Sequence, residues 1–375
     1  MEYIPFDRRE FEVKEMHYCG PSMNFKARWP DFPIEEPIYN RPISEKENFR
    51  AWFRGEKTLW RPAGGWYGCD MNVFRPRMNP DNVVAHCICD AERDYQYENN
   101  VMRSSWYDLD WVYVPVAGGS TVMPGNPKIE DMKDWKELVK IPDLDELDWE
   151  GCAEKNREYL DTPLFNQLGI LSGLWERLIS LMDVSGAAIA LVDEDQKEYV
   201  KEFFEAHTEM LIEYIRRMKE ICDIDGVLIH DDWGTQRAGF FSLDTAMEML
   251  VPYLKKITDA VHDMGMYFEL HSCGKTQDLV PAYIAAGVDQ WNPQAMNDLL
   301  MLAETYKDQP ITFGMQEIDI QPDATEEEQA EAATKWYDTY KDYRVIPAFF
   351  RSATPVIRNT IYELSRIDSE KQFKK

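Results

Sequence analysis

The chain has 375 residues, of which 44% are apolar and 29% charged, and these ordinary globular values exclude a disordered, collagenous or coiled-coil protein. Its 68 acidic residues outnumber its 41 basic ones, and the net charge of −27 disfavours nucleic-acid and membrane partners. With no run of 18 apolar residues, no secretory leader and an odd number of cysteines, seven, we expect a cytoplasmic protein with reduced thiols.

The N-terminal part of the chain has no regular hydrophobic period. Residues 1–50 are rich in proline and aromatic side chains, and we expect an irregular extension that packs on a main domain of residues 51–375. Short extended runs follow at 58–66, 82–90 and 110–120. One of these runs contains His86, Cys87 and Cys89, a spacing compatible either with metal ligation or with buried thiols.

From about residue 165 short apolar runs alternate with long amphipathic stretches. Gly265 is placed to end one helix, and Thr325 forms a capping box with Glu328 at the start of another. Neither a GxGxxG fingerprint nor a phosphate-binding P-loop is present, which disfavours a nucleotide-binding fold. Repeated strand–helix units predict a parallel sheet, and we expect an α/β fold, a (β/α)₈ TIM barrel. The predicted strands are 167–173, 226–232, 266–274, 288–293, 310–317 and 344–350, and the predicted helices include 198–223, 244–264, 326–341 and 354–366.

Polar residues gather at the predicted C-terminal strand ends, where the active sites of such barrels lie. His271 and Cys273 are two residues apart on one strand, so their side chains point to the same face. Imidazole and thiolate are ligands that suit Zn²⁺, and the pair therefore predicts a metal site. A histidine hydrogen-bonded beside a buried cysteine would explain the same pattern without metal.

The run His230, Asp231 and Asp232 ends the preceding strand and could supply acid–base groups. Adjacent residues of a strand point to opposite faces, so only one of the two aspartates can face the pocket, and the other should cap or pair with a helix. One of Gln316 and Glu317 should likewise face inward at a later strand end. The candidate substrate-binding residues are Trp66, Tyr67, Trp233, Gln294 and Gln316.

Two segments carry a family resemblance. GVLIHDDWGTQ and YFELHSCGKTQDLVPAYIAAGVDQWNPQ resemble the uroporphyrinogen decarboxylase superfamily, and more narrowly its corrinoid-dependent methyltransferase branch. The resemblance covers roughly residues 50–366. It implies a (β/α)₈ barrel that transfers a methyl group between a small molecule and a corrinoid protein, with zinc held by His271 and Cys273. The small molecule would be a methoxylated aromatic, a methylamine or a thiol.

Two departures from the family pattern shape these expectations. The zinc-binding members usually add a late cysteine ligand, but no cysteine follows Cys273, so either another residue completes the site or zinc binding is weak or lost. Of the residues that could complete it, we expect Glu317, ahead of Glu269 and Gln294. The decarboxylase is marked by an arginine-rich N-terminal motif, whereas TLWRPAGGWYGCD has one arginine. The alternatives are a decarboxylase-like lyase acting on a smaller substrate and a non-catalytic binding member of the fold.

Overall fold

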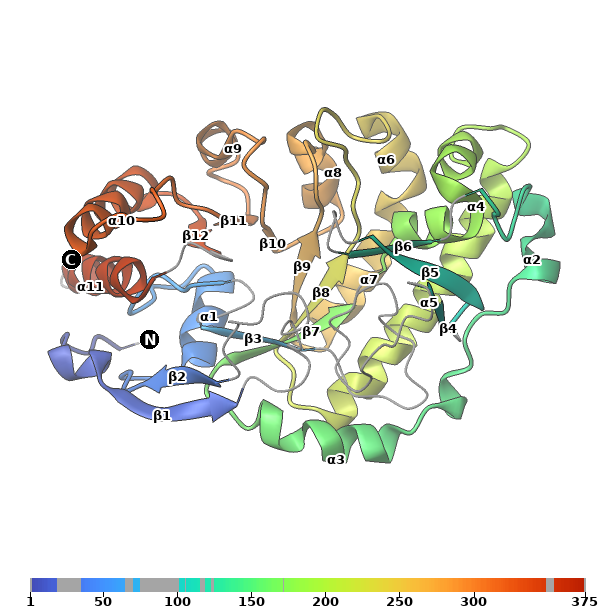
Figure 1. The fold of residues 1–375 in the computed structure, drawn as a ribbon. Helices are drawn as coiled ribbons and strands as arrows, with labels where there is room; N and C mark the ends of the chain where they lie inside the picture. Colours follow the sequence, from blue (N-terminus) through green and yellow to red (C-terminus); the bar gives the residue numbers. More distant parts are fainter. Residues whose placement is uncertain are drawn as a thin grey trace.

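A computed structural model of the chain describes residues 2–18, 35–64, 70–74, 101–104, 106–114, 119–122, 125–170, 172–348 and 354–373 (Figure 1). The candidates Trp66, Tyr67, His86, Cys87 and Cys89 lie outside these residues, as does the predicted strand 82–90.

The strands form three sheets. A pair at the N-terminus has the order β1-β2, a small antiparallel sheet has the order β4-β5-β6, and a seven-stranded parallel sheet has the order β12-β11-β10-β9-β8-β7-β3. Figure 1 places the small sheet on one side of the parallel sheet and the two chain ends on the other. The strands are β1 (Val13–Tyr18), β2 (Glu35–Tyr39), β3 (Met71–Phe74), β4 (Val101–Ser104), β5 (Leu109–Val114), β6 (Gly119–Val122), β7 (Phe165–Ile170), β8 (Gly226–His230), β9 (Tyr267–His271), β10 (Gln290–Trp291), β11 (Thr312–Met315) and β12 (Val345–Pro347).

The parallel sheet curls toward a barrel. Its two outer strands, β3 and β12, are bridged by residues 61–64. The Gly64 N–H donates to the carbonyl of Pro347 (2.8 Å), and the Ala63 carbonyl accepts from the Asp70 N–H (2.9 Å). The described residues therefore give seven strands, with a hydrogen-bonded segment in the eighth position. The predicted α/β architecture with a curled parallel sheet is confirmed, whereas a complete ring of eight strands is not.

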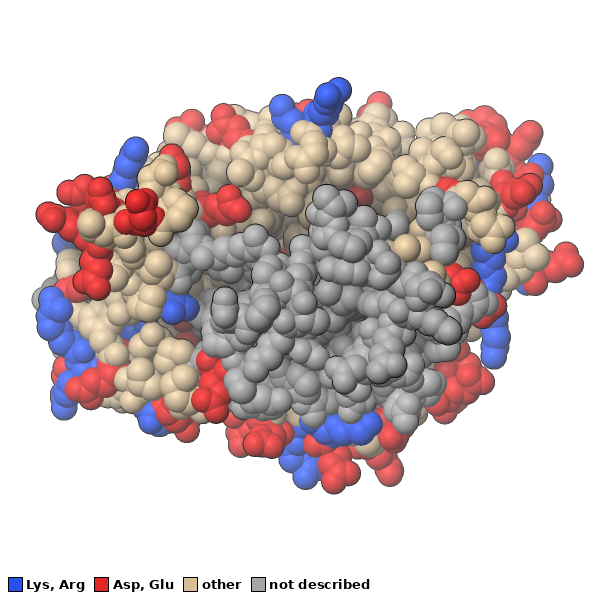
Figure 2. Space-filling model, viewed as in Figure 1, with Lys and Arg blue, Asp and Glu red and all other residues tan. Residues whose placement is uncertain are grey.

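Helices cover the outside of this sheet. The α-helices are α1 (Glu45–Phe53), α2 (Trp135–Leu138), α3 (Trp149–Leu160), α4 (Leu174–Ala190), α5 (Lys197–Ile221), α6 (Leu243–Met249), α7 (Val251–Asp263), α8 (Val280–Ala285), α9 (Leu299–Thr305), α10 (Glu326–Tyr340) and α11 (Pro355–Phe373). Among the described helices, none is long and apolar enough to cross a bilayer. On the face shown in Figure 2, acidic side chains lie around the margin together with basic ones.

The predicted single helix 244–264 is wrong, because the structure breaks it at Leu250 into α6 and α7. Pro252 lies in the first turn of α7 and has no N–H to continue the preceding helix. Met247 of α6 is 42% exposed, whereas Leu254, Ile257 and Val261 of α7 are buried. Gly265 ends α7 with a φ of 72°, and the capping box at Thr325 opens α10, so both terminus predictions are confirmed.

Helix α1 crosses the N-terminal end of the sheet. Its Phe49 ring packs 5.2 Å from that of Phe165 at the start of β7, and its Arg50 forms an ion pair with buried Asp225 just before β8. The helix runs through residue 50, the boundary predicted between the extension and the main domain. The N-terminal end of the sheet is thus covered, and the opposite end carries the polar strand termini.

Candidate metal centre

Two neighbouring strands end in histidine. β8 and β9 are parallel, and their register pairs His230 directly with His271. The two rings stack with centroids 4.4 Å apart and an interplanar angle of 18°. Because the residues are the last of strands running in the same direction, both imidazoles lie at the C-terminal end of the sheet.

The loops after these strands add a carboxylate and a thiol. One donor atom from each of His230, Asp232, His271 and Cys273 lies within 4.8 Å of the other three. His271 Nε2 is 3.2 Å from Cys273 Sγ, and the Asp232 carboxylate oxygen is 3.7 Å from His230 Nε2 and 3.9 Å from His271 Nε2. We call these four residues the four-residue cluster. It contains both members of the predicted His271–Cys273 pair.

The backbone after β9 holds Cys273 in place. The Cys273 N–H donates to Asp232 Oδ1 (2.7 Å), and the Gly274 N–H donates to Gln294 Oε1 (2.7 Å). The Gln294 side-chain amide also reaches Cys273 Sγ at 3.4 Å. Gly274 has a φ of 89°, and a Cβ atom there would lie 2.7 Å from the carbonyl oxygen of Thr235. Only glycine therefore fits this turn without strain.

The two aspartates after β8 point to different places, as strand alternation predicts. Asp231 is buried and accepts hydrogen bonds from the backbone N–H groups of Trp175 (3.2 Å) and Glu176 (2.8 Å) in the first turn of α4. Gly173, which precedes that turn, offers no capping side chain, so Asp231 supplies the cap from a neighbouring strand. Asp232 joins the four-residue cluster instead.

Glu176 is a site residue that the sequence reasoning missed. Its carboxylate is 3.0 Å from His230 Nδ1, which leaves His230 Nε2 directed at the cluster. A histidine that binds a metal commonly donates its other ring N–H to a carboxylate in this way, which fixes the ring and its tautomer. Its position could have suggested this role, because Glu176 lies six residues after the end of β7 and therefore near the C-terminal end of the sheet.

Burial and charge shift the ionisation of these groups. Burial alone would lower the pKa of His230, but the carboxylates of Glu176 and Asp232 outweigh it and hold that pKa well above its ordinary value. Burial lowers the pKa of His271 to about 4, with help from His230, and raises the pKa of Cys273 to about 11. Burial also raises the pKa of Glu176 to about 7. Burial thus favours the neutral forms of both His271 and Cys273.

The donor set fits a zinc ion. Bonds of about 2.0–2.1 Å to nitrogen and about 2.3 Å to sulfur place tetrahedral donor atoms roughly 3.3–3.8 Å apart. The separations of 3.2, 3.7 and 3.9 Å between donor atoms of the cluster lie close to that range. Two imidazoles, a thiol and a carboxylate are also the ligand types that zinc takes in proteins.

The remaining predicted site residues lie elsewhere. Glu317 is exposed and does not belong to the four-residue cluster, so the structure does not support the third ligand expected from the sequence. Trp233 is fully buried, and its indole N–H donates to Asp231 (2.7 Å), which makes it a packing residue behind the centre. The Gln316 side chain donates to the Asn292 carbonyl (2.6 Å) at the end of β10.

A second buried carboxyl lies deeper in the sheet interior. Glu269, two residues before His271, accepts from the side-chain amides of Gln167 (3.0 Å), Gln290 (3.1 Å) and Asn292 (2.6 Å). Barrel interiors are usually filled by branched apolar side chains, so this polar layer is unusual. Because these amides hydrogen-bond the Glu269 carboxylate, we do not count Glu269 as a ligand of the centre.

Comparison with known proteins agrees with this architecture. The chain resembles a methyltransferase from Methanosarcina mazei with a TM-score of 0.57 and 12% identity, over 87% of this chain and 99% of that one. It resembles a B12-independent methionine synthase from Shewanella sp. W3-18-1 at 14% identity over 74% of this chain and 76% of that one, with a TM-score of only 0.40. At these identities the first likeness shows a shared fold, and we draw nothing from the second.

No curated protein is significantly similar in sequence. The sequence model of the family described as uroporphyrinogen decarboxylase (URO-D) matches residues 159–316, a span that contains the whole four-residue cluster. This match bears out the resemblance to the uroporphyrinogen decarboxylase superfamily inferred from the sequence.

Proposed function

We propose that the protein is a methyltransferase that moves a methyl group between a small molecule and a corrinoid protein, with a zinc ion at the four-residue cluster. The single observation that carries the proposal is the convergence of two imidazoles, a thiol and a carboxylate within 4.8 Å at the C-terminal ends of β8 and β9. The fold shared with a methyltransferase supports the same reading.

We assign His230, His271 and Cys273 as the zinc ligands, because three protein ligands leave a catalytic zinc one position for substrate. A bound zinc ion would act as a Lewis acid on the atom that carries the methyl group. Glu176 holds His230 through Nδ1, and Gln294 holds the Cys273 turn. Asp231 fixes the start of α4, and with it Glu176, relative to β8.

Asp232 is the group we assign to the substrate. Its side chain is 29% exposed, against 17% for His230 and 14% for His271. The methyl group leaves as a formal CH₃⁺, the bonding pair stays on the oxygen, nitrogen or sulfur atom, and the accepting pair comes from reduced cobalt of the partner's corrinoid. Although burial opposes it, His230 and His271 hold the pKa of Asp232 below its ordinary value, so its carboxylate would accept a hydrogen bond from a protonated substrate atom and stabilise positive charge there.

The charge of the site favours small, weakly charged substrates. Glu176, Asp231 and Asp232 all lie at or beside the centre, and their carboxylates would repel a ligand that carries many carboxylates of its own. Methoxylated aromatics, methylamines and thiols remain suitable. The family match leaves a lyase acting on a smaller acid as the second candidate.

Cobalt absorbance tests the proposal. The purified protein is mixed with a reduced corrinoid protein and each candidate methyl donor, and the spectrum is followed with time. We expect a donor-dependent spectral change that is lost in Cys273→Ser and in Asp232→Asn but kept in Cys222→Ser, a control at a buried cysteine after α5. No spectral change with any donor, together with release of CO₂ from a small acid, would replace this function by the lyase.

A further inference from the structure

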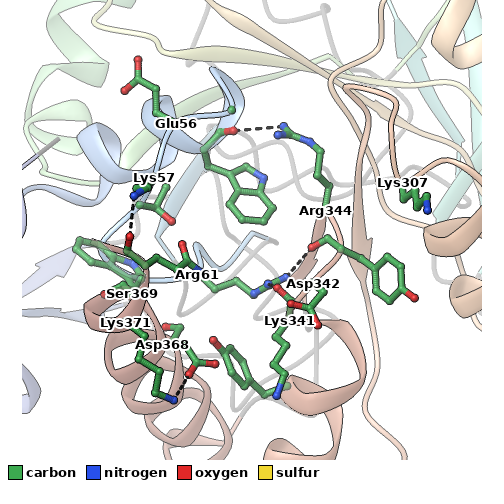
Figure 3. Close-up of a pocket in the computed structure, with 18 residues that line it drawn as sticks. Glu56, Lys57, Arg61, Lys307, Lys341, Asp342, Arg344, Asp368, Ser369 and Lys371 are labelled. Atoms are coloured by element: carbon green, nitrogen blue, oxygen red, sulfur yellow. Dashed lines mark hydrogen bonds and ion pairs between the residues drawn. The ribbon is translucent and has the colours of Figure 1, made fainter. Parts of the chain in front are cut away.

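A cavity of about 440 Å³ lies at the opposite end of the sheet from the metal centre. Its walls come from the segment after α1, from Lys307 before β11, from residues 341–344 before β12 and from α11 (Figure 3). The segments before β11 and β12 lead into the N-terminal ends of their strands. We call this the N-terminal cavity, and the residues of the proposed methyl-transfer site do not line it.

The N-terminal cavity reverses the charge balance of the chain. Six cationic side chains line it against three carboxylates, although acidic residues predominate in the whole sequence. Glu56 pairs with Arg54, which does not line the cavity (2.7 Å). Two of the six cations are themselves paired, Lys371 with Asp368 (2.7 Å) and Lys341 with Asp338 (2.9 Å). The cations are Lys57, Arg61, Lys307, Lys341, Arg344 and Lys371.

The fold accounts for one of the two arginines. The Arg61 guanidinium is buried and donates to main-chain carbonyls at and after the C-terminal end of α10, among them those of Tyr340 (3.1 Å) and Tyr343 (3.0 Å). Carbonyls at a helix end lack intrahelical partners and carry partial negative charge, so a cation belongs there for structural reasons alone. Arg61 therefore needs no ligand.

Arg344 and Lys307 have no comparable structural use. The Arg344 Nη2 atom makes two long contacts of 3.3 Å, to the Trp52 carbonyl and Thr312 Oγ1, and its Nε is buried without a hydrogen-bond partner among the described residues. Burial also lowers the pKa of this guanidinium. Lys307 is exposed and forms no ion pair within the described part of the chain. Both groups can accept an anion.

The Trp52 ring lies close to both guanidinium groups. The centroid of the Trp52 ring is 5.4 Å from the Cζ atom of Arg61 and also 5.4 Å from that of Arg344. The Trp52 indole N–H donates to Thr312 Oγ1 (3.1 Å), which fixes the ring. Figure 3 shows the Arg61 side chain crossing the middle of the view, with Arg344 above it, Lys307 to one side and Lys57 to the other.

We propose that the N-terminal cavity binds a small phosphorylated ligand, with Arg344 and Lys307 as its anchors. Guanidinium and ammonium groups together match the several acceptor oxygens and the double charge of a phosphate group. A volume of about 440 Å³ lies within the range of about 300–1,000 Å³ found for ligand pockets, so a nucleotide or a sugar phosphate would fit.

Calorimetric titration with pyrophosphate at fixed ionic strength tests this site. We expect pyrophosphate to bind the wild-type protein. Its affinity for Lys307→Gln and for Arg344→Gln should be at least tenfold lower. Lys335→Gln, which removes an exposed charge of α10 that does not line the cavity, should change the affinity less than twofold. Citrate, a polycarboxylate of similar charge, should bind at least tenfold more weakly than pyrophosphate.

Several outcomes would overturn the proposal. These are no pyrophosphate binding by the wild-type protein, an equal loss in Lys335→Gln, citrate binding as tight as that of pyrophosphate, and a loss below tenfold in Lys307→Gln. Circular dichroism shows whether Arg344→Gln is folded. If it is not, Lys307→Gln decides alone, because Lys307 is exposed and its loss leaves the packing unchanged.

Discussion

The two ends of the parallel sheet carry opposite chemistry. At the C-terminal end, four donor side chains of β8, β9 and their loops lie close together. The Glu176 carboxylate contacts His230, and the Asp231 carboxylate caps the helix that carries Glu176. At the N-terminal end, cations predominate around a cavity, and one of them satisfies helix carbonyls. Strand direction explains part of this contrast. Loops at the C-terminal end lead into helix N-termini, which favour carboxylates such as Asp231, whereas those at the N-terminal end follow helix C-termini, whose carbonyls favour cations such as Arg61.

The largest effect should come from the metal ligands. Cys273→Ser removes the thiolate donor, and we expect zinc affinity to fall more than 100-fold, because a hydroxyl is a much poorer zinc ligand. Elemental analysis of dialysed protein measures the loss, with Cys222→Ser as the control. Equal zinc contents in the wild-type protein and Cys273→Ser would contradict the assignment of a zinc site to the C-terminal end of the sheet.

The turn after β9 should be the most sensitive backbone position. Gly274→Ala introduces a Cβ against the backbone of Gly234 and Thr235 at a positive φ, and we expect a loss of about 3 kcal/mol in unfolding free energy. Gly125→Ala has a similar φ of 79° with open space around it and should cost about 1 kcal/mol. Urea denaturation compares the two variants. Similar losses would mean that the close approach beside Cys273 is unimportant.

Removing the carboxylate behind His230 tests how far the centre depends on its support. Glu176→Gln keeps the shape but weakens the hold on Nδ1, and we expect zinc affinity to fall about 10- to 100-fold. Competition with a zinc chelator measures this change. An unchanged affinity would show that packing alone orients His230.

A pH-dependent effect is expected at the N-terminal end. Burial, reinforced by Asp70, raises the pKa of Glu45 in the folded protein from 4.5 to about 7. The folded state therefore binds this proton more tightly, so the contribution of Glu45 is most favourable below about pH 4.5 and is lost as the pH rises toward 7. We therefore compare the unfolding free energies of Glu45→Gln and the wild-type protein at two pH values. The difference, variant minus wild type, should be about 1–2 kcal/mol larger at pH 7.5 than at pH 5. Parallel denaturation curves at both pH values give the difference, and a constant difference would contradict it.

The smallest effect is expected at Glu317. This side chain is exposed and outside the four-residue cluster, so Glu317→Gln should leave zinc affinity unchanged within a factor of two. The chelator competition used for Glu176→Gln applies here without modification. A tenfold loss would restore Glu317 as a ligand and would require the loop after β11 to move toward β9.

The polar residues at the strand ends could be predicted from the sequence, because each of these motifs consists of residues only a few positions apart. A strand that ends in His271 and continues to Cys273 presents both side chains on one face wherever it lies in the sheet. Glu176 and Asp231 were harder to predict, since one completes a histidine and the other caps a helix across about 55 residues of sequence. Contacts of that kind depend on which strands are neighbours, and no local period encodes this.

The sequence by itself determined the alternation of strands and helices, the helix termini at Gly265 and Thr325, and the chemistry of the His271–Cys273 pair, because these depend on residues a few positions apart. The tertiary structure alone decided which groups join that pair. The in-register pairing of β8 with β9 brought His230 and Asp232 to the pair, whereas Glu317, the third ligand expected from the sequence, is exposed. The physical reason is that a parallel sheet brings together residues about 40 positions apart, at distances set by strand spacing and not by sequence.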